Sequence, residues 1–226
     1  MRTLAAILLG LLLATSAHAE VMCISGPMQP QVIAGRRAQV AGSGGVIVAA
    51  GEKLPDWRFR DLNKVVRPRV TALAPGLAIY HPPPLPGTDV VLEDGNHSVI
   101  ARMVRALTIE EPAGAPRVKA ITATTVAGGR RAALAELAEK APEHAVAIIV
   151  SRVERDHLVP LTWAQVSGNQ PPSVLVWHTP YSCEATIPAS IEPKVGERVV
   201  LTWIDDAGRV SEPSKSIVIA GASKGK

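Results

Sequence analysis

The chain has 226 residues, of which 47% are hydrophobic and 3% aromatic, and its formal net charge is +4. This length suits one large domain or two domains of about 100 residues each. The basic residues occur as scattered pairs such as Arg36-Arg37 and Arg130-Arg131, with few aromatic residues among them, so the composition excludes a typical nucleic-acid-binding protein.

The N-terminus has the pattern of a secretory signal peptide, residues 1–19. Arg2 supplies the positive start, residues 4–14 form the apolar run, and Ala17 and Ala19 are the small residues that a signal peptidase reads. The run is too short for a membrane-spanning helix, which needs about 20 residues, and no second long apolar run follows. We therefore expect cleavage after Ala19 and a periplasmic or extracellular protein without a transmembrane helix in its mature chain.

The mature chain keeps two cysteines, Cys23 and Cys183, which lie about 160 residues apart. In an exported protein an even number of cysteines favours a disulfide, and two buried free thiols are the alternative. Met22 stands where a bacterial lipoprotein normally carries a small residue, which disfavours lipid attachment at Cys23. A disulfide would fix the mature N-terminus to the C-terminal half of the chain.

Short β-branched runs separated by turn residues fill residues 20–109. Strands are predicted at 31–34, 45–49, 64–66, 77–80, 89–92 and 98–101. The segments between them, such as 42–45, 81–84 and 93–96, are rich in glycine, proline, asparagine and aspartate. Short strands at this spacing predict an all-β sandwich or barrel, and we expect 20–109 to form an N-terminal β-sandwich domain.

A linker is predicted at residues 110–116, which contain two prolines, a glycine and two glutamates. Residues 117–222 repeat the β texture and are expected to form a second β-sandwich domain, followed by a flexible tail at 223–226. The continuous apolar run 145–150 indicates a central strand buried on both faces. Residues 130–140 contain good helix formers and fit either a short helix or a strand. The other strands are predicted at 118–125, 161–166, 173–177, 196–204 and 215–219.

The last predicted hairpin is similar to a known family. An alternating strand leads into Asp205-Asp206-Ala207-Gly208, a Ser211-Glu212-Pro213-Ser214 step follows, and a closing strand returns. This pattern resembles the last two strands of a fibronectin type III or immunoglobulin-like sandwich, and the resemblance extends over residues 117–222. Residues 73–80 resemble the strand-capping loop of bacterial Ig-like modules. The resemblance implies two tandem Ig-like or fibronectin III-like domains but no particular activity, because this fold serves many functions.

Metal binding is one alternative function. His97, Asp94 and Met103 form the most ligand-like group in the sequence, since no histidine or cysteine pair has the spacing of a zinc site. Small periplasmic copper-binding proteins of sandwich fold often begin with a histidine, whereas the mature chain here would begin with Glu20. A copper site at His97, Asp94 and Met103 would require these side chains to converge.

The aromatic and polar residues Trp177, His178 and Tyr181 are the best candidate binding patch. Strand residues alternate between faces, so Trp177 shares a face with Leu175. If the Leu175 face is the core, Trp177 is buried and Tyr181 is exposed to contact a partner.

The sequence contains no nucleophile elbow, phosphate loop or other motif of a catalytic site. We therefore expect no catalytic residues, no cofactor and no nucleic-acid partner. The expected function is that of a non-catalytic, exported binding or structural module of the bacterial envelope, whose partner is a protein or another component of the envelope surface. The alternatives are the copper-binding protein and a pilus-type assembly chaperone, which matches in size and export but whose signature stretch is absent.

Overall fold

A computed structural model describes residues 29–34, 44–51, 53–61, 64–82, 89–104, 113–126, 129–155, 157–166, 173–178 and 191–222. The predicted signal peptide, both cysteines and Tyr181 lie outside these residues. All regular elements in the described ranges are strands, which confirms the all-β class. Within the same ranges, no helix is long and apolar enough to cross a membrane.

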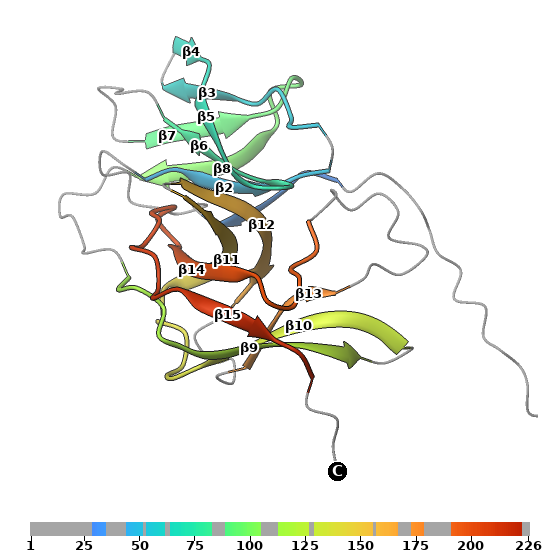
Figure 1. Ribbon diagram of the computed structural model, residues 1–226. Coiled ribbons are helices and arrows are strands. Elements are labelled where there is room, and N and C mark those ends of the chain that lie inside the picture. Colours follow the sequence, from blue (N-terminus) through green and yellow to red (C-terminus); the bar gives the residue numbers. More distant parts are fainter. Residues whose placement is uncertain are drawn as a thin grey trace, which may run out of the picture.

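The first eight strands form the N-terminal part of the molecule (Figure 1). One four-stranded sheet has the order β1-β2-β6-β5 and the other has the order β4-β3-β7-β8. The strands are β1 (Gln31–Ala34), β2 (Val46–Ala49), β3 (Arg58–Asp61), β4 (Lys64–Val66), β5 (Arg69–Ala74), β6 (Leu77–His81), β7 (Asp89–Glu93) and β8 (Val99–Val104). Apolar side chains from both sheets, among them Val48, Phe59, Tyr80, Leu92 and Met103, share one buried core. The N-terminal part is therefore compatible with a β-sandwich.

Six of these strands were predicted from the sequence, whereas β3 and β5 were not. In β3 the charged residues Arg58, Arg60 and Asp61 surround a single aromatic residue, Phe59, whose side chain is fully buried. In β5 most residues are exposed, because β5 lies at the edge of its sheet. Both strands therefore lack the apolar run by which the other strands could be identified.

The remaining strands form the C-terminal part, a seven-stranded sheet with the order β12-β11-β14-β15-β9-β10-β13. The strands are β9 (Val118–Val126), β10 (Arg130–Leu137), β11 (Ala145–Glu154), β12 (His157–Gln165), β13 (Ser173–His178), β14 (Arg198–Asp205) and β15 (Ile217–Ala220). All neighbours are antiparallel except β15 and β9, which are parallel. The sheet curls until its edges meet, where Thr162 Oγ1 of β12 donates a hydrogen bond of 3.4 Å to the carbonyl oxygen of Val176 in β13. The C-terminal part is thus nearly a barrel around one core.

The segment 130–140, which fitted either a helix or a strand, contains strand β10. Its buried residues Ala133, Ala135 and Leu137 alternate with the exposed residues Leu134 and Glu136. β10 pairs with β9 on one side and with β13 on the other. These two ladders outweigh the intrinsic helix preference of its alanine, leucine and glutamate residues.

A β-bulge in β13 decides the position of Trp177. Ala133 of β10 lies opposite Trp177, and Leu134 lies opposite Leu175, so Val176 is the additional residue. Val176 and Trp177 are both buried, whereas Leu175 is 40% exposed. The prediction that Trp177 is buried is confirmed. The expectation that Leu175 shares its buried face was wrong, because the bulge interrupts the alternation on which it depended.

A third apolar cluster joins the two parts of the molecule. It combines Ile47, Leu77 and Ile79 of the N-terminal part with Ile149 and Ile204 of the C-terminal part. Figure 1 shows β2 of the N-terminal part lying against the layer formed by β11 and β12. The sheet β1-β2-β6-β5 therefore packs on both faces, and β11 is buried on both faces, as its apolar run predicted.

Candidate functional site

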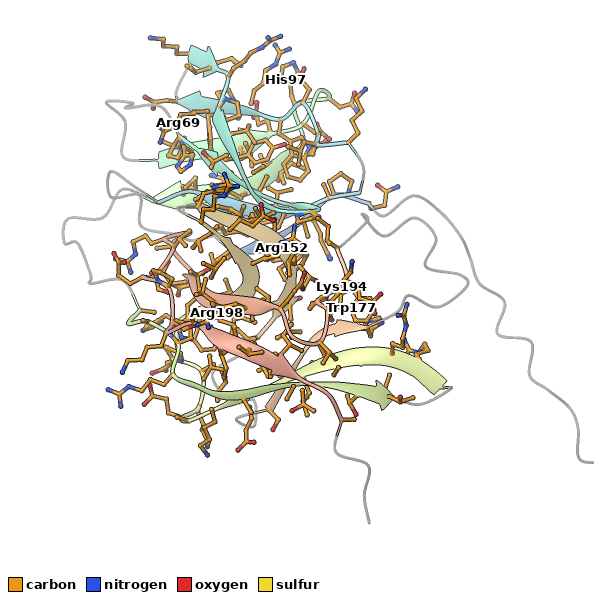
Figure 2. All side chains as sticks on the ribbon, viewed as in Figure 1. Arg69, His97, Arg152, Trp177, Lys194 and Arg198 are labelled. Atoms are coloured by element: carbon orange, nitrogen blue, oxygen red, sulfur yellow. The ribbon has the colours of Figure 1, made fainter. Side chains whose placement is uncertain are left out.

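The residues of the predicted binding patch lie at the end of β13. Trp177 is 8% exposed and belongs to the core of the C-terminal part (Figure 2). His178 is half-buried, and its Nδ1 lies 3.0 Å from Nη1 of Arg130. Tyr181 lies outside the described residues. Of the three residues, His178 presents a polar group beside a cation, whereas Trp177 contributes to folding rather than to an accessible surface.

The residues considered for a copper site occupy two environments. Asp94 and His97 lie in the turn between β7 and β8, where Asp94 Oδ1 accepts hydrogen bonds of 2.8 Å from the backbone N–H groups of Asn96 and Ser98. Met103 is fully buried in the core of the N-terminal part. In the described ranges, no group of three or more His, Cys, Asp and Glu residues could hold a metal ion.

The carboxylate of Glu93 contacts two basic side chains at this turn. Its carboxylate accepts a 2.7 Å hydrogen bond from Arg60 Nε, and His97 Nδ1 lies 3.6 Å from the other oxygen. The hydrogen bond from Arg60 is the largest of the effects that hold the pKa of Glu93 below its ordinary value. The side chain of Glu93 is nearly inaccessible, whereas His97 is exposed. The arrangement therefore fixes the β7–β8 turn on its sheet.

The junction between the two parts contains a site that the sequence analysis did not identify. The turn after β14 contacts the start of β2, where the backbone N–H of Gly45 donates a 3.0 Å hydrogen bond to the carbonyl oxygen of Ala207. Gly208 has φ 77° and lies so close to Gly45 that an added Cβ would be 2.9 Å from the Gly45 nitrogen. Two glycines thus allow backbone to pack on backbone across the junction.

The carboxylate of Asp205 holds this turn in shape. Oδ1 accepts hydrogen bonds from the backbone N–H groups of Ala207 (3.1 Å) and Arg209 (2.8 Å). Oδ2 accepts a 2.7 Å hydrogen bond from Arg209 Nε, and both side chains are largely buried. The predicted turn at 205–208 is therefore present, and a buried ion pair orders it for contact with Gly45.

At the other end of β2 and β6, an apolar cavity of about 430 Å³ opens between the two parts. One wall is the β5–β6 hairpin, and another contains Leu54, which precedes β3, and Pro160 of β12. Trp163 of β12 crosses the junction and donates a 3.2 Å hydrogen bond from Nε1 to the carbonyl oxygen of Pro75. The lining residues are Gly51, Leu54, Ala72, Leu73, Ala74, Pro75, Gly76, Leu77, Ala78 and Pro160. A cavity of this size and composition can bind an apolar group.

A small polar cluster lies on β5 and β6, at the end away from this hairpin. Arg69 lies opposite His81, and Thr71 Oγ1 lies 3.1 Å from His81 Nε2. Burial lowers the pKa of His81 below its ordinary value, and the charge of Arg69 lowers it further. The edge strand β5 therefore presents a cation at one end and the apolar cavity at the other.

The sequence held one signal for this site, namely residues 73–80, which resembled a strand-capping loop. They form the tight β5–β6 hairpin, in which Gly76 has φ 73° after Pro75, as a type II turn requires. The remaining lining residues are glycine, alanine, leucine and proline, which occur in every β protein, so their convergence could not be identified from the sequence. A search of protein families and of curated proteins finds no match to this chain.

Proposed function

We propose that the chain is an exported, non-catalytic binding or structural module of the bacterial envelope. In this proposal it consists of two immunoglobulin-like domains, residues 20–109 and 117–222, connected by the linker 110–116. The signal-peptide pattern of residues 1–19 supports export. The strand order supports the two immunoglobulin-like domains, and the junction between the two parts supports the binding or structural role.

The strand order of the N-terminal part supports an immunoglobulin-like fold. With its eight strands lettered in chain order as A, B, C, C′, D, E, F and G, one sheet reads A-B-E-D and the other reads C′-C-F-G. These are the two sheets of an immunoglobulin-like sandwich with an added C′ strand. Each sheet contains two antiparallel pairs of consecutive strands, β1–β2 and β5–β6 in one and β3–β4 and β7–β8 in the other, and the chain passes between the sheets from β2 to β3, from β4 to β5 and from β6 to β7.

The C-terminal part gives the same order with seven strands. Lettered A, B, C, C′, E, F and G, its sheet reads C′-C-F-G followed by A-B-E, joined through the parallel pair of β15 and β9. Ser211 and Ser214 belong to the segment 211–214, which resembles the fibronectin type III pattern. Their side chains contact the backbone of β14. Ser211 Oγ and Ser214 Oγ each accept a 2.9 Å hydrogen bond, from the backbone N–H groups of Trp203 and Leu201.

The observation that carries the functional proposal is the apolar junction. Two β units connected only by a linker would move independently, whereas a hydrophobic interface holds them in one orientation. Here Ile47 and Ile79 pack with Ile149 and Ile204, and the Gly45–Ala207 hydrogen bond adds a polar contact. A fixed orientation suits a module that spaces or joins partners at a set geometry.

Export can be tested by mass spectrometry of the protein recovered from the envelope fraction of its own host. We expect the mass of residues 20–226 without lipid, and a mass lower by two hydrogens than the reduced chain if Cys23 and Cys183 are paired. A chain that retains residues 1–19 in the cytoplasm would contradict the proposal, and a diacylated Cys23 would change it to a membrane-anchored module.

Binding can be tested by photo-crosslinking in the same host. A crosslinking amino acid is placed at one exposed position per surface, namely Val70, Val99, Leu175 and Val218. The proposal predicts a discrete adduct with one envelope component from one surface and none from the others. Absence of an adduct from all four positions, in an exported and folded protein, would contradict a binding role.

A further inference from the structure

The N-terminal part has an open side formed by two edge strands. β4 is the outer strand of one sheet and β5 is the outer strand of the other, and only Arg67 and Pro68 connect them. We call residues 64–72 the edge surface. Most of its side chains are exposed, including Val65 and Val70, the latter at 39%. An edge strand directs every second N–H and C=O group away from its sheet, where another strand can pair with it.

The edge surface is basic. Lys64, Arg67 and Arg69 are exposed, and within the described part of the chain none of them forms an ion pair with a carboxylate. Two other arginines of the N-terminal part are neutralised, since Arg58 lies 3.3 Å from Asp56 and Arg60 contacts Glu93, whereas Arg102 on β8 is exposed and has no ion pair in the described residues. Figure 2 shows Arg69 in the N-terminal part, well apart from His97 in the β7–β8 turn. Positive charge without a counter-ion is therefore concentrated on this side.

The positive charge of the edge surface favours one kind of partner strand over another. A second copy of the same edge would bring like charges opposite each other across the ladder, which is unfavourable. An acidic strand would instead place carboxylates opposite Arg67 and Arg69. Arg69 is the first residue of β5 and Arg67 lies two residues before it, so carboxylates at the adjoining end of a partner strand would lie near both arginines.

The cavity at the junction adjoins the edge surface. Ala72 belongs to the edge surface and also lines the cavity, whose lining includes Leu54 and Pro160. The distance from Arg69 to Ala72 is three residues, or about 10 Å along a strand. A strand that pairs with β5 therefore has carboxylates near Arg69 at one end and can insert an apolar side chain into the cavity at the other.

We propose that the edge surface binds an acidic, extended segment of a partner protein, which adds as a strand to β5 and places an apolar side chain in the junction cavity. This inference rests on the proposed binding function and assigns it a surface and a partner chemistry. Backbone hydrogen bonds would provide affinity, and the arginines and the cavity would provide specificity.

The test uses the purified chain and synthetic probes. The first probe is a fluorescent peptide of alternating glutamate and valine that ends in leucine, and its binding is followed by fluorescence anisotropy. A second peptide carries lysine in place of glutamate, and a third has the first sequence with alternate backbone nitrogens methylated. We expect saturable binding of the first peptide, and at least tenfold weaker binding of both others.

Two protein variants locate the site. The double variant Arg67→Glu with Arg69→Glu should weaken binding of the first peptide at least tenfold. Arg102→Glu is the matched control, because Arg102 is an exposed arginine without an ion pair in the described residues, on the edge strand β8 of the same part. It should change the affinity less than twofold.

Several results would overturn the proposal. Equal binding of the methylated peptide would exclude strand addition, and equal effects of the two variants would indicate general charge attraction. Binding of phosphatidylglycerol vesicles through Arg67 and Arg69, without binding of the peptide, would make the surface a membrane contact instead. Crosslinking of an envelope component elsewhere on the molecule, together with no peptide binding, would leave the proposed function intact and remove only this surface.

Discussion

Gly208 packs directly against the backbone of Gly45, and this contact joins two segments separated by more than 160 positions in the sequence. Any Cβ at Gly208 would overlap the carbonyl oxygen of Gly45 and approach its nitrogen to 2.9 Å. Because the two glycines come from different parts of the molecule, the contact sets how closely those parts approach. Replacing either glycine therefore tests the junction itself.

We predict that Gly208→Ala destabilises the protein by about 2–4 kcal/mol. A residue with φ 77° costs about 1 kcal/mol when it gains a Cβ, and overlap in a packed region adds about 1–3 kcal/mol. Gly196→Ala is the control, since Gly196 has φ 86° with no atom within 4 Å of the added Cβ. Urea unfolding should show only the smaller cost for the control, and equal costs for both variants would contradict a tight junction.

Asp205→Ala should destabilise the protein by about 3–5 kcal/mol, because it removes one partner of a buried ion pair and two hydrogen bonds to the backbone. The neighbouring Asp206 is exposed, and its carboxylate lies 3.4 Å from Nδ1 of His144. Asp206→Ala should therefore change the free energy of unfolding by less than about 1 kcal/mol. A large effect of both substitutions would show that the turn is sensitive at every position.

Trp177→Ala should cost about 3–5 kcal/mol, as expected for a large buried side chain whose removal leaves a cavity. Leu175→Ala, two residues away but exposed, should cost less than about 1 kcal/mol. Thermal or urea unfolding of the two variants checks the position of the bulge, since a regular strand would make both substitutions costly.

The stability of the protein should fall on acidification in a window just below pH 6.5. The pKa of His81 is lowered in the folded state by burial and by Arg69, so the unfolded chain binds the proton first as the pH falls. Stability is therefore fully present above the unfolded pKa and is lost as the pH falls through the folded pKa. His81→Gln should reduce this slope, and an imidazole that titrates at or above 6.5 by NMR would contradict the assignment.

The sequence predicted the elements whose signals are local. Runs such as 31–34 and 77–80 alternate or concentrate apolar residues, and proline or glycine ends them, so strands β1 and β6 followed directly. Edge strands gave weaker signals. β5 is exposed over most of its length and was missed, although the turn that ends it was recognised at Pro75 and Gly76.

The candidate site could be predicted only in part. Trp177 was correctly expected to be buried, but the reason failed because the pairing with β10 introduces a bulge at Val176. The residues of the cavity carry no chemical signature, and they meet only because the β5–β6 hairpin lies against β12. The unpaired charge of Arg67 and Arg69 likewise depends on which acids lie nearby in space.

By itself, the sequence determined the all-β class and the position of most strands, because hydrophobic period and turn chemistry act over a few neighbouring residues. Tertiary structure alone decided that residues 130–137 form a strand, that the C-terminal sheet curls almost into a barrel, and that Ile47 and Ile149 share one cluster. The physical reason is that strand pairing and burial are set by partners distant in the chain, and the free energy of those contacts outweighs local propensity.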